Sequence, residues 1–302
     1  MPKDIMTRLQ NNELLLMDGG TGSELQRRGI GIARGVTPGG DIGPWSARAL
    51  GESPDTVSAV HEDYLKAGAD IIITNTFWSN PTRLSMDGIG DRWKDYNKIA
   101  GELAVRARDS INPEAYVAAG IAPPHNDYPG TFKELRGQAE VLAQTGVDVI
   151  LPEYVGSLND CQQVIDACSE IGLPVFLGVK HVNERLKDPV ALVKALEGRR
   201  VDAILAMCTL PDKTSKRLPE LRKAFEGVIG AYANIGYETS EEVTGDPNQQ
   251  MREINWGENS PEKYAAYGKE WIGMGAQIIG GCCATGPEHI ASLRPVVKGL
   301  SN

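Results

Sequence analysis

The chain has 302 residues, a length typical of an α/β barrel and sufficient to bury a large core without disulfides. Its 31 Lys and Arg residues against 40 Asp and Glu residues give a net charge of −9, which argues against nucleic acid or an anionic membrane as a partner. No apolar run approaches the roughly 20 residues that cross a bilayer, and the N-terminal segment lacks the apolar stretch of a signal peptide. We therefore predict a cytoplasmic protein whose five cysteines are reduced.

Short apolar runs rich in β-branched residues recur along the chain and predict eight strands. Each run is nearly continuous in apolar character, as in strands of a parallel sheet that are buried on both faces. In chain order the runs cover residues 14–18, 69–75, 115–121, 147–153, 174–180, 201–207, 228–234 and 276–282.

Amphipathic segments between the runs predict crossover helices, among them residues 53–67, 157–171, 189–197, 218–225 and 261–274. Three helices end in a glycine shortly before the next run, in the sequences AGAD, TGVD and MGAQ, and glycine there suits a left-handed C-cap. Repeated strand–helix units without a linker predict a single (β/α)8 TIM barrel domain over residues 1–302. The alternative is an open doubly wound sheet, for which the sequence offers no glycine-rich dinucleotide fingerprint. Two longer polar stretches, 30–44 and 235–258, are predicted loops.

Reactive and polar residues follow the C-terminal ends of these runs, which is where barrel enzymes place their active sites. A purely structural role would scatter such residues over both ends of the strands, so the clustering predicts a functional site. The residues are Asp18 with Gly19 and Gly20, Phe77 with Trp78, Glu153 with Tyr154, Cys208, Asn234, and Cys282 with Cys283.

Cys208, Cys282 and Cys283 follow the sixth and eighth runs, whose ends can meet over the mouth of a barrel. Adjacent cysteines in a regular strand point to opposite faces, so both bind one ion only if the chain bends, and we expect Gly280 and Gly281 to permit that bend. Three thiolates select zinc over harder ions and leave one tetrahedral position for a substrate. From spacing alone, a buried free pair and a vicinal disulfide stay open as alternatives.

Two further cysteines and two histidines are predicted to be structural. Cys161 and Cys168 lie seven residues apart on one predicted helix, which places both in the core. His61 lies within a predicted helix and His289 at the start of the last one.

Four segments carry a resemblance to a known family. DGGTGSELQRRG (18–29), HEDYLKAGADIIITNTF (61–77), YANIG (232–236) and GGCCATGPEHI (280–290) resemble signature segments of the homocysteine S-methyltransferases. That family includes betaine–homocysteine and S-methylmethionine–homocysteine methyltransferases and the homocysteine domain of cobalamin-dependent methionine synthase. The resemblance extends from residue 14 to about residue 293, and it implies a methyltransferase that holds Zn²⁺ through the three cysteines.

The implied reaction needs a thiolate, because a free thiol with a pKa near about 8.5 is mostly protonated at neutral pH. Coordination of the homocysteine thiol to zinc would deprotonate it, so no dedicated general base is required. The resemblance implies that Asp18 and Glu153 hold the amino group of homocysteine, and the amides of Gly19 and Gly20 can receive its carboxylate. The alternative is a capping Asp and a solvated Glu. Asn234 is a further candidate for substrate contact.

The methyl donor is predicted to bind aromatic side chains, because a transferable methyl group on nitrogen or sulfur is cationic and is attracted to aromatic faces. Trp45, Phe77, Trp78 and Tyr154 all fall in predicted mouth segments, although aromatic residues make up only 6% of the chain. The alternative is that they only pack the mouth. Trp45 and Tyr154 resemble aromatic positions of the betaine branch, which favours betaine or a sulfonium such as dimethylsulfoniopropionate over S-methylmethionine. Met207 departs from the Asn that the family commonly carries before the cysteine.

Three functions remain open from the sequence. The first is a self-contained homocysteine methyltransferase that uses a small onium donor, and the second takes its methyl group from a separate corrinoid protein. The third is a non-enzymatic barrel that binds zinc or a thiol ligand. The predicted partners are small molecules rather than nucleic acid or membrane, and a homo-oligomer is compatible with the sequence.

Overall fold

The computed structural model describes residues 3–32, 43–180, 188–236 and 260–299. The loops predicted at 30–44 and 235–258 fall largely outside these residues. Within the described residues the chain has an α/β fold with eight strands, and the paired strands all run parallel. Each strand lies inside one of the eight predicted runs, which confirms those predictions. The strands are β1 Leu15–Leu16, β2 Ile71–Ile73, β3 Tyr116–Ile121, β4 Val149–Pro152, β5 Phe176–Lys180, β6 Ala203–Met207, β7 Val228–Ala233 and β8 Ala276–Gly281.

The strands form a five-stranded sheet in the order β1-β8-β7-β6-β5 and a three-stranded sheet in the order β2-β3-β4. Isolated parallel bridges connect the two sheets at both edges. Met17 pairs with Ile71 beside β1 and β2, and Ile150 pairs with Val175 beside β4 and β5. The carboxyl ends of the strands therefore lie on one side of the molecule.

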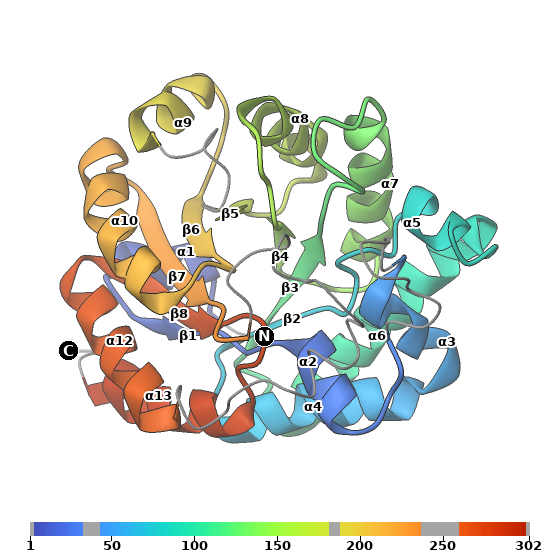
Figure 1. The fold of residues 1–302 in the computed structure, drawn as a ribbon, viewed down its shortest axis with the longest axis horizontal. Coiled ribbons are helices and arrows are strands. Elements are labelled where there is room, and N and C mark those ends of the chain that lie inside the picture. The colour runs from blue at the N-terminus through green and yellow to red at the C-terminus, as the bar shows by residue number, and fades with distance from the viewer. Residues whose placement is uncertain (1–2, 33–42, 181–187, 237–259, 300–302) are drawn as a thin grey trace.

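Helices surround the strands, as Figure 1 shows. Their bounds are α1 Ile5–Gln10, α2 Thr21–Arg27, α3 Ala49–Glu52, α4 Pro54–Ala67, α5 Pro81–Ser85, α6 Trp93–Ile111, α7 Thr131–Ala143, α8 Leu158–Cys168, α9 Pro189–Ala195, α10 Pro211–Ala224, α12 Pro261–Gly273 and α13 Pro287–Gly299. Short 3₁₀ turns cover Trp45–Arg48, Gly90–Arg92 and Ser169–Ile171.

The helix ends follow local sequence signals. Gly68, Gly146 and Gly275 all have positive φ (106°, 90° and 93°), which confirms the left-handed turns predicted from AGAD, TGVD and MGAQ. One predicted boundary was wrong: α10 begins at Pro211 and not at residue 218. In the first turn of a helix the N–H that proline lacks would have no intrahelical partner, so nothing is lost, and the fixed φ of proline favours helix initiation there.

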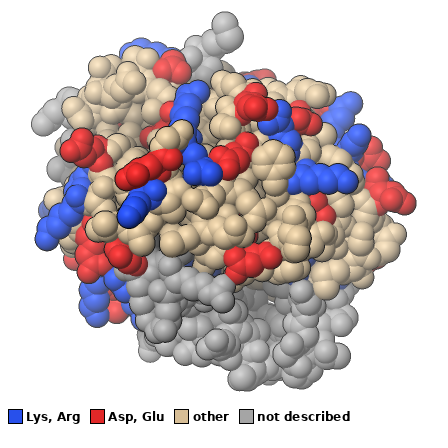
Figure 2. Space-filling model, turned by 90° about the horizontal axis from the view of Figure 1, so that it is seen from above, with Lys and Arg blue, Asp and Glu red and all other residues tan. Residues whose placement is uncertain are grey.

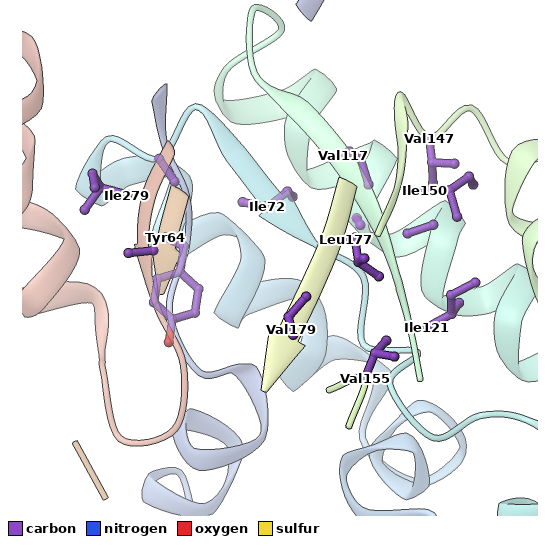
Figure 3. Packing of buried hydrophobic residues seen from close by; sticks show 14 of the residues in the cluster. Tyr64, Ile72, Val117, Ile121, Val147, Ile150, Val155, Leu177, Val179 and Ile279 are labelled. Carbon is purple, nitrogen blue, oxygen red and sulfur yellow. The ribbon is translucent and has the colours of Figure 1, made fainter. Parts of the chain in front are cut away.

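Alternate residues of each strand pack into two different hydrophobic clusters, which is why the runs are continuously apolar. Leu16 belongs to the outer cluster between strands and helices, and Figure 3 shows further members such as Ile72, Val117 and Leu177. Leu15 belongs to the inner cluster, which also receives Leu9 of α1. The inner cluster extends from this helix to the cysteine-bearing ends of β6 and β8.

A repeated contact, here called the strand clasp, joins three strand pairs, each time through the aspartate that directly precedes the second strand of the pair. Asp70 donates its amide to the Leu16 carbonyl (2.6 Å), and its carboxylate accepts from the Leu16 amide (2.9 Å). Asp148 does the same with Val117, at 2.8 and 2.7 Å. The third clasp joins Asp202 to Val175, at 2.9 and 2.8 Å. Each clasp fixes the register of an even-numbered strand against the strand before it.

Each clasp carboxylate also has a cationic neighbour. Lys298 contacts both oxygens of Asp70 at 2.7 Å, and Arg108 lies 3.0 Å from Asp148. A buried charge needs such a partner, so these ion pairs support the backbone bonds.

Acidic and basic side chains are interspersed on the face shown in Figure 2. No helix among the described residues is long and apolar enough to cross a membrane.

Candidate active site

The three cysteines predicted to bind a metal lie together at the carboxyl ends of β6 and β8. The Sγ atom of Cys283 is 4.0 Å from that of Cys208 and 3.9 Å from that of Cys282, and all three Sγ atoms lie within 4.8 Å of one another. None of them forms a disulfide. Three sulfurs at about 2.3 Å from one tetrahedral ion would be about 3.8 Å apart, so these thiols could hold a metal with little movement.

The adjacent cysteines meet because the chain leaves β8 in a tight turn. The Thr285 amide donates to the Cys282 carbonyl (3.2 Å), which closes a turn around Cys283 and Ala284. Ala284 has φ +67°, the left-handed value that a type II turn requires at its third position. Cys283 is therefore a turn residue and not a strand residue, so its side chain is free of the strict alternation of a strand.

Gly280 and Gly281 do not supply the bend that the sequence analysis assigned to them, because both remain in β8 and neither has positive φ. They are needed for close packing instead. A Cβ atom at Gly281 would lie 2.0 Å from Thr285 Oγ1, and one at Gly280 would lie 2.8 Å from Met17 Cβ.

Non-glycine residues in left-handed conformations mark this end of the molecule. Cys208, Tyr154 and Trp45 have φ of +46°, +58° and +50°. Such conformations cost of order 1–3 kcal/mol each and persist where surrounding contacts fix them. Here the Cys208 amide donates to the Tyr232 carbonyl at 3.0 Å, and the Tyr154 amide donates to the sulfur of Met207 at 2.7 Å.

Met207, which stands where the family commonly carries Asn, accepts hydrogen bonds through its thioether sulfur. Besides the amide of Tyr154, its thioether sulfur accepts a hydrogen bond from the Tyr232 hydroxyl at 3.2 Å. The same hydroxyl oxygen lies 3.1 Å from Glu153 Oε1, so its single proton can be donated to either acceptor. The Tyr232 hydroxyl therefore lies between the side chain of Met207, the residue before Cys208, and the carboxylate of Glu153.

Asp18 and Glu153 form a buried acidic pair. Asp18 is fully buried; its Oδ2 accepts from the Ile73 amide at 2.8 Å, while Oδ1 has no hydrogen-bond partner. Burial, with a further contribution from Glu153, raises the pKa of Asp18 well above its usual range. Burial also raises the pKa of Glu153 to about 8, although the hydrogen bond from Tyr232 opposes the shift. Two buried carboxyls with an unpartnered oxygen can accept a cationic group.

Gly19 and Gly20 connect Asp18 to the cysteine turn. A Cβ atom at Gly19 would lie 2.3 Å from the Thr285 carbonyl oxygen, and one at Gly20 would lie 2.5 Å from the Cys282 carbonyl oxygen, so both positions require glycine. The Gly20 amide already donates to the Thr285 carbonyl at 3.0 Å. Of the two amides predicted to receive a carboxylate, Gly19 is therefore the better candidate.

The four predicted aromatic residues form a continuous row. Ring centroids are 6.3 Å apart for Trp45 and Trp78, 4.9 Å for Trp78 and Phe77, and 5.6 Å for Phe77 and Tyr154. Tyr154 packs against the inner cluster, and burial followed by the nearby thiols of Cys208, Cys283 and Cys282 raises its pKa well above the usual range, so this end of the row lies near the thiols.

Two cations of the chain already lie on this row. The Arg83 guanidinium carbon is 3.8 Å from the Trp78 ring centroid, and the Lys180 amine is 3.7 Å from the Tyr154 ring centroid. One face of Trp78 and one face of Tyr154 are thus occupied, which leaves their other faces, Trp45 and Phe77 for a bound molecule.

Lys180 is a site residue that the sequence analysis missed. It is the last residue of β5, its side chain is buried, and its amine donates to the Tyr154 hydroxyl. Burial lowers the pKa of Lys180, and the nearby thiols of Cys208, Cys283 and Cys282 oppose that shift. A charged residue closing the apolar run PVFLGVK was the available signal.

Without a metal, the three thiols of the cluster differ in pKa. Hydrogen bonds from Cys282 and Cys283 lower the pKa of Cys208 well below its usual range, and Lys180 adds to the effect. The pKa values of Cys282 and Cys283 are raised, chiefly by Cys208.

Asn234 follows β7, and its side-chain oxygen accepts a hydrogen bond from the Gly236 amide at 2.7 Å. This contact shapes the local turn, and a substrate contact through Asn234 stays a prediction.

The residues predicted to be structural are buried. Cys161 and Cys168 lie in the outer cluster, where burial raises the pKa of Cys168 to about 12. His61 is fully buried in α4, and burial lowers its pKa to about 4. His289 is buried in α13, with Nδ1 accepting from the Gly286 amide at 3.1 Å.

Comparison with known proteins matches residues 15–297 to a family model described as homocysteine S-methyltransferase. Among curated relatives, Homocysteine S-methyltransferase YbgG of Bacillus subtilis is 25% identical, with 97% of each chain covered. S-methylmethionine–homocysteine S-methyltransferase BHMT2 of Pongo abelii is 27% identical over 96% of this chain and 80% of its own.

Among solved structures, the metallated form of the homocysteine methyltransferase MmuM from Escherichia coli superposes with a TM-score of 0.74. The two chains are 22% identical, and the match covers 97% of this chain and 99% of the other. The two proteins therefore share their fold.

Proposed function

The chain belongs to the homocysteine S-methyltransferase family, and from that premise we propose that it transfers a methyl group from a small onium donor to the thiol of homocysteine, giving methionine. The observation that carries this proposal is the juxtaposition, at one end of the strands, of three free thiols with a buried carboxyl pair and an aromatic row. We further propose that the two sheets, bridged at both edges, close into a single (β/α)8 barrel domain with this site at its mouth.

We propose zinc as the resident metal, held by Cys208, Cys282 and Cys283. The sulfur–sulfur distances suit a tetrahedral ion, and thiolate ligands favour zinc over magnesium or calcium. When bound, zinc would lower the pKa of a coordinated substrate thiol, so that the reacting sulfur is present as the thiolate. A cytosolic location, where thiols stay reduced, suits such a site.

The acidic pair would hold the amino group of homocysteine. The unpartnered Oδ1 of Asp18 and the carboxyl of Glu153 supply negative charge to a buried ammonium, which in turn compensates the cost of burying them. The Gly19 amide would receive the substrate carboxylate. These contacts orient the thiol toward the cysteines and reduce the entropy cost of the reaction.

The aromatic row would bind the methyl donor. The sulfur of homocysteine attacks the donor methyl carbon, and the bond from that carbon to the donor nitrogen or sulfur breaks, with the electron pair staying on the leaving atom. Betaine or a sulfonium such as dimethylsulfoniopropionate or S-methylmethionine fits this chemistry. Packed rings attract the cationic methyl group and exclude water that would compete for it.

The test is a donor screen with purified, zinc-loaded protein and homocysteine, with methionine formation as the readout. Formation of methionine with one of the three onium donors alone supports the proposal. If methionine forms only when a methylated corrinoid protein is added, the donor is a partner protein. If no methionine forms with either type of donor while zinc and homocysteine bind, the chain is a binding protein.

A further inference from the structure

We propose that Lys180 is a positioning residue of the thiolate centre, whose positive charge offsets the negative charge that collects when the three cysteines and a substrate thiolate share one divalent ion. This inference rests on the proposed function, because it takes Cys208, Cys282 and Cys283 as zinc ligands.

The backbone places Lys180 beside the cysteines. It ends β5, and the strand register pairs it with Met207, the residue that precedes Cys208. Its amide donates to the Val155 carbonyl at 3.1 Å, which fixes the end of the strand. The side chain is only 8% exposed, so its amine is held at the mouth of the site and not in solvent.

The local partners of the amine do not neutralise its charge. The amine donates to the hydroxyl of Tyr154 and lies over the same ring, and both contacts are with a neutral group. Among the residues that the structure describes, no carboxylate forms an ion pair with Lys180. A buried ammonium without an anion is costly and burial lowers the pKa of Lys180, so a nearby anion would favour its charged form. The thiols of Cys208, Cys283 and Cys282 are the groups that favour its charged form.

Charge arithmetic gives the reason for a cation at this place. Three thiolates and one divalent ion carry a formal charge of −1, and a substrate thiolate raises it to −2. One lysine ammonium restores −1. Charges interact strongly in a site from which water is largely excluded, so the lysine should favour both metal binding and binding of an anionic thiolate.

Tyr154 acquires a different role from the one the sequence indicated. Its hydroxyl and one ring face hold the amine of Lys180, so that ring orients a resident cation before any donor arrives. Phe77, Trp45 and the face of Trp78 that Arg83 does not cover are then left for the methyl donor.

The experiment compares full-length Lys180→Met, Lys180→Gln and Lys180→Arg with the parent protein. Zinc affinity is measured by competition with a chromophoric chelator, and binding of homocysteine and methionine to the zinc-loaded protein by calorimetry. We expect the two neutral variants to bind zinc about tenfold more weakly, as is usual when an outer partner of a metal site is removed, and Lys180→Arg to stay near the parent value. Homocysteine, which adds a thiolate, should weaken more than methionine, which adds a neutral thioether.

Lys194→Met on α9 is the matched control, because it removes the same charge from an exposed position. Thermal unfolding of the metal-free proteins identifies any variant that fails to fold. If Lys180→Met does not fold, the zinc affinity of Lys180→Gln, which keeps a hydrogen-bond donor for Tyr154, is the deciding measurement. Equal zinc affinity in parent, Lys180→Met and Lys180→Gln would overturn the inference, as would an equal loss in Lys180→Arg. If the parent itself binds no zinc, the proposed metal centre is wrong and this inference is wrong with it.

Discussion

Replacing Glu153 by Gln separates the charge of this side chain from its shape. The Gln side chain occupies the same volume and can still accept the hydrogen bond that Tyr232 donates at 3.1 Å. What it cannot do is ionise. The variant therefore tests whether the Glu153 carboxyl gains a negative charge when a substrate ammonium binds.

The raised pKa sets the magnitude. With a pKa of about 8 for Glu153, roughly one carboxyl in ten is ionised at pH 7. A bound ammonium favours the ionised form, so binding should release about 0.9 protons from this group, at a cost of about 1.4 kcal/mol at pH 7. The charge-assisted contact that replaces the proton contributes about 1.5–3 kcal/mol, or very roughly 10- to 150-fold in affinity.

The assay is calorimetric titration with methionine, in two buffers that differ in ionisation enthalpy. Methionine carries the same ammonium and carboxylate as homocysteine but has no thiol proton to confuse the count. Glu153→Gln should release about 0.9 fewer protons at pH 7 than the parent, and its affinity should lose most of the rise toward pH 8 that the parent shows. Glu226→Gln, exposed before β7, is the matched control. Equal proton release in parent and Glu153→Gln would refute the role of this carboxyl.

Four further outcomes are expected. Because the folded pKa of Glu153 lies above its ordinary value of 4.5, stability without ligand should fall as the pH rises from about 4.5 to 8, and urea unfolding of Glu153→Gln should show a smaller fall. Cys282→Ala should lower the zinc content of protein prepared under reducing conditions, and unchanged metal stoichiometry would contradict the ligand assignment. Trp78→Leu should reduce kcat/KM for a cationic donor by about one to two orders of magnitude while homocysteine binding stays near normal; unchanged donor kinetics would show that the ring only packs. Asp148→Ala leaves the Val117 amide unpaired, so denaturant unfolding should show a loss of about 1–3 kcal/mol, and a change within error would mean that the clasp adds no stability.

The strands and the edge that carries the site could be predicted because their signals are local. An apolar run such as residues 174–180 can be recognised without its partners, and parallel strands place their carboxyl ends on one side. The location of Asp18, Glu153 and the cysteines at one end of the molecule follows from those two facts.

The finer geometry depends on contacts between distant parts of the chain. The bend at Cys282 comes from the turn that ends at Thr285. Position 281 requires glycine because Thr285 packs against it, so the two glycines were a wrong explanation for the bend. The left-handed conformation of Cys208 has no signature in the sequence, because cysteine rarely adopts it. The direction taken by the Lys180 side chain depends on where Tyr154 lies, and chain order does not contain that information.

The strand clasps also separate the parts of the chain that keep it folded from the parts that form the candidate site. Asp70, Asp148 and Asp202 hold β2, β4 and β6 at their amino ends, whereas the thiols and aromatic rings follow the carboxyl ends of strands. Because register is set far from the mouth, segments at the mouth can change length or composition without realigning the strands beneath them. A protein engineer could therefore exchange the segment that carries Trp78 to seek a new donor, and leave every clasp untouched.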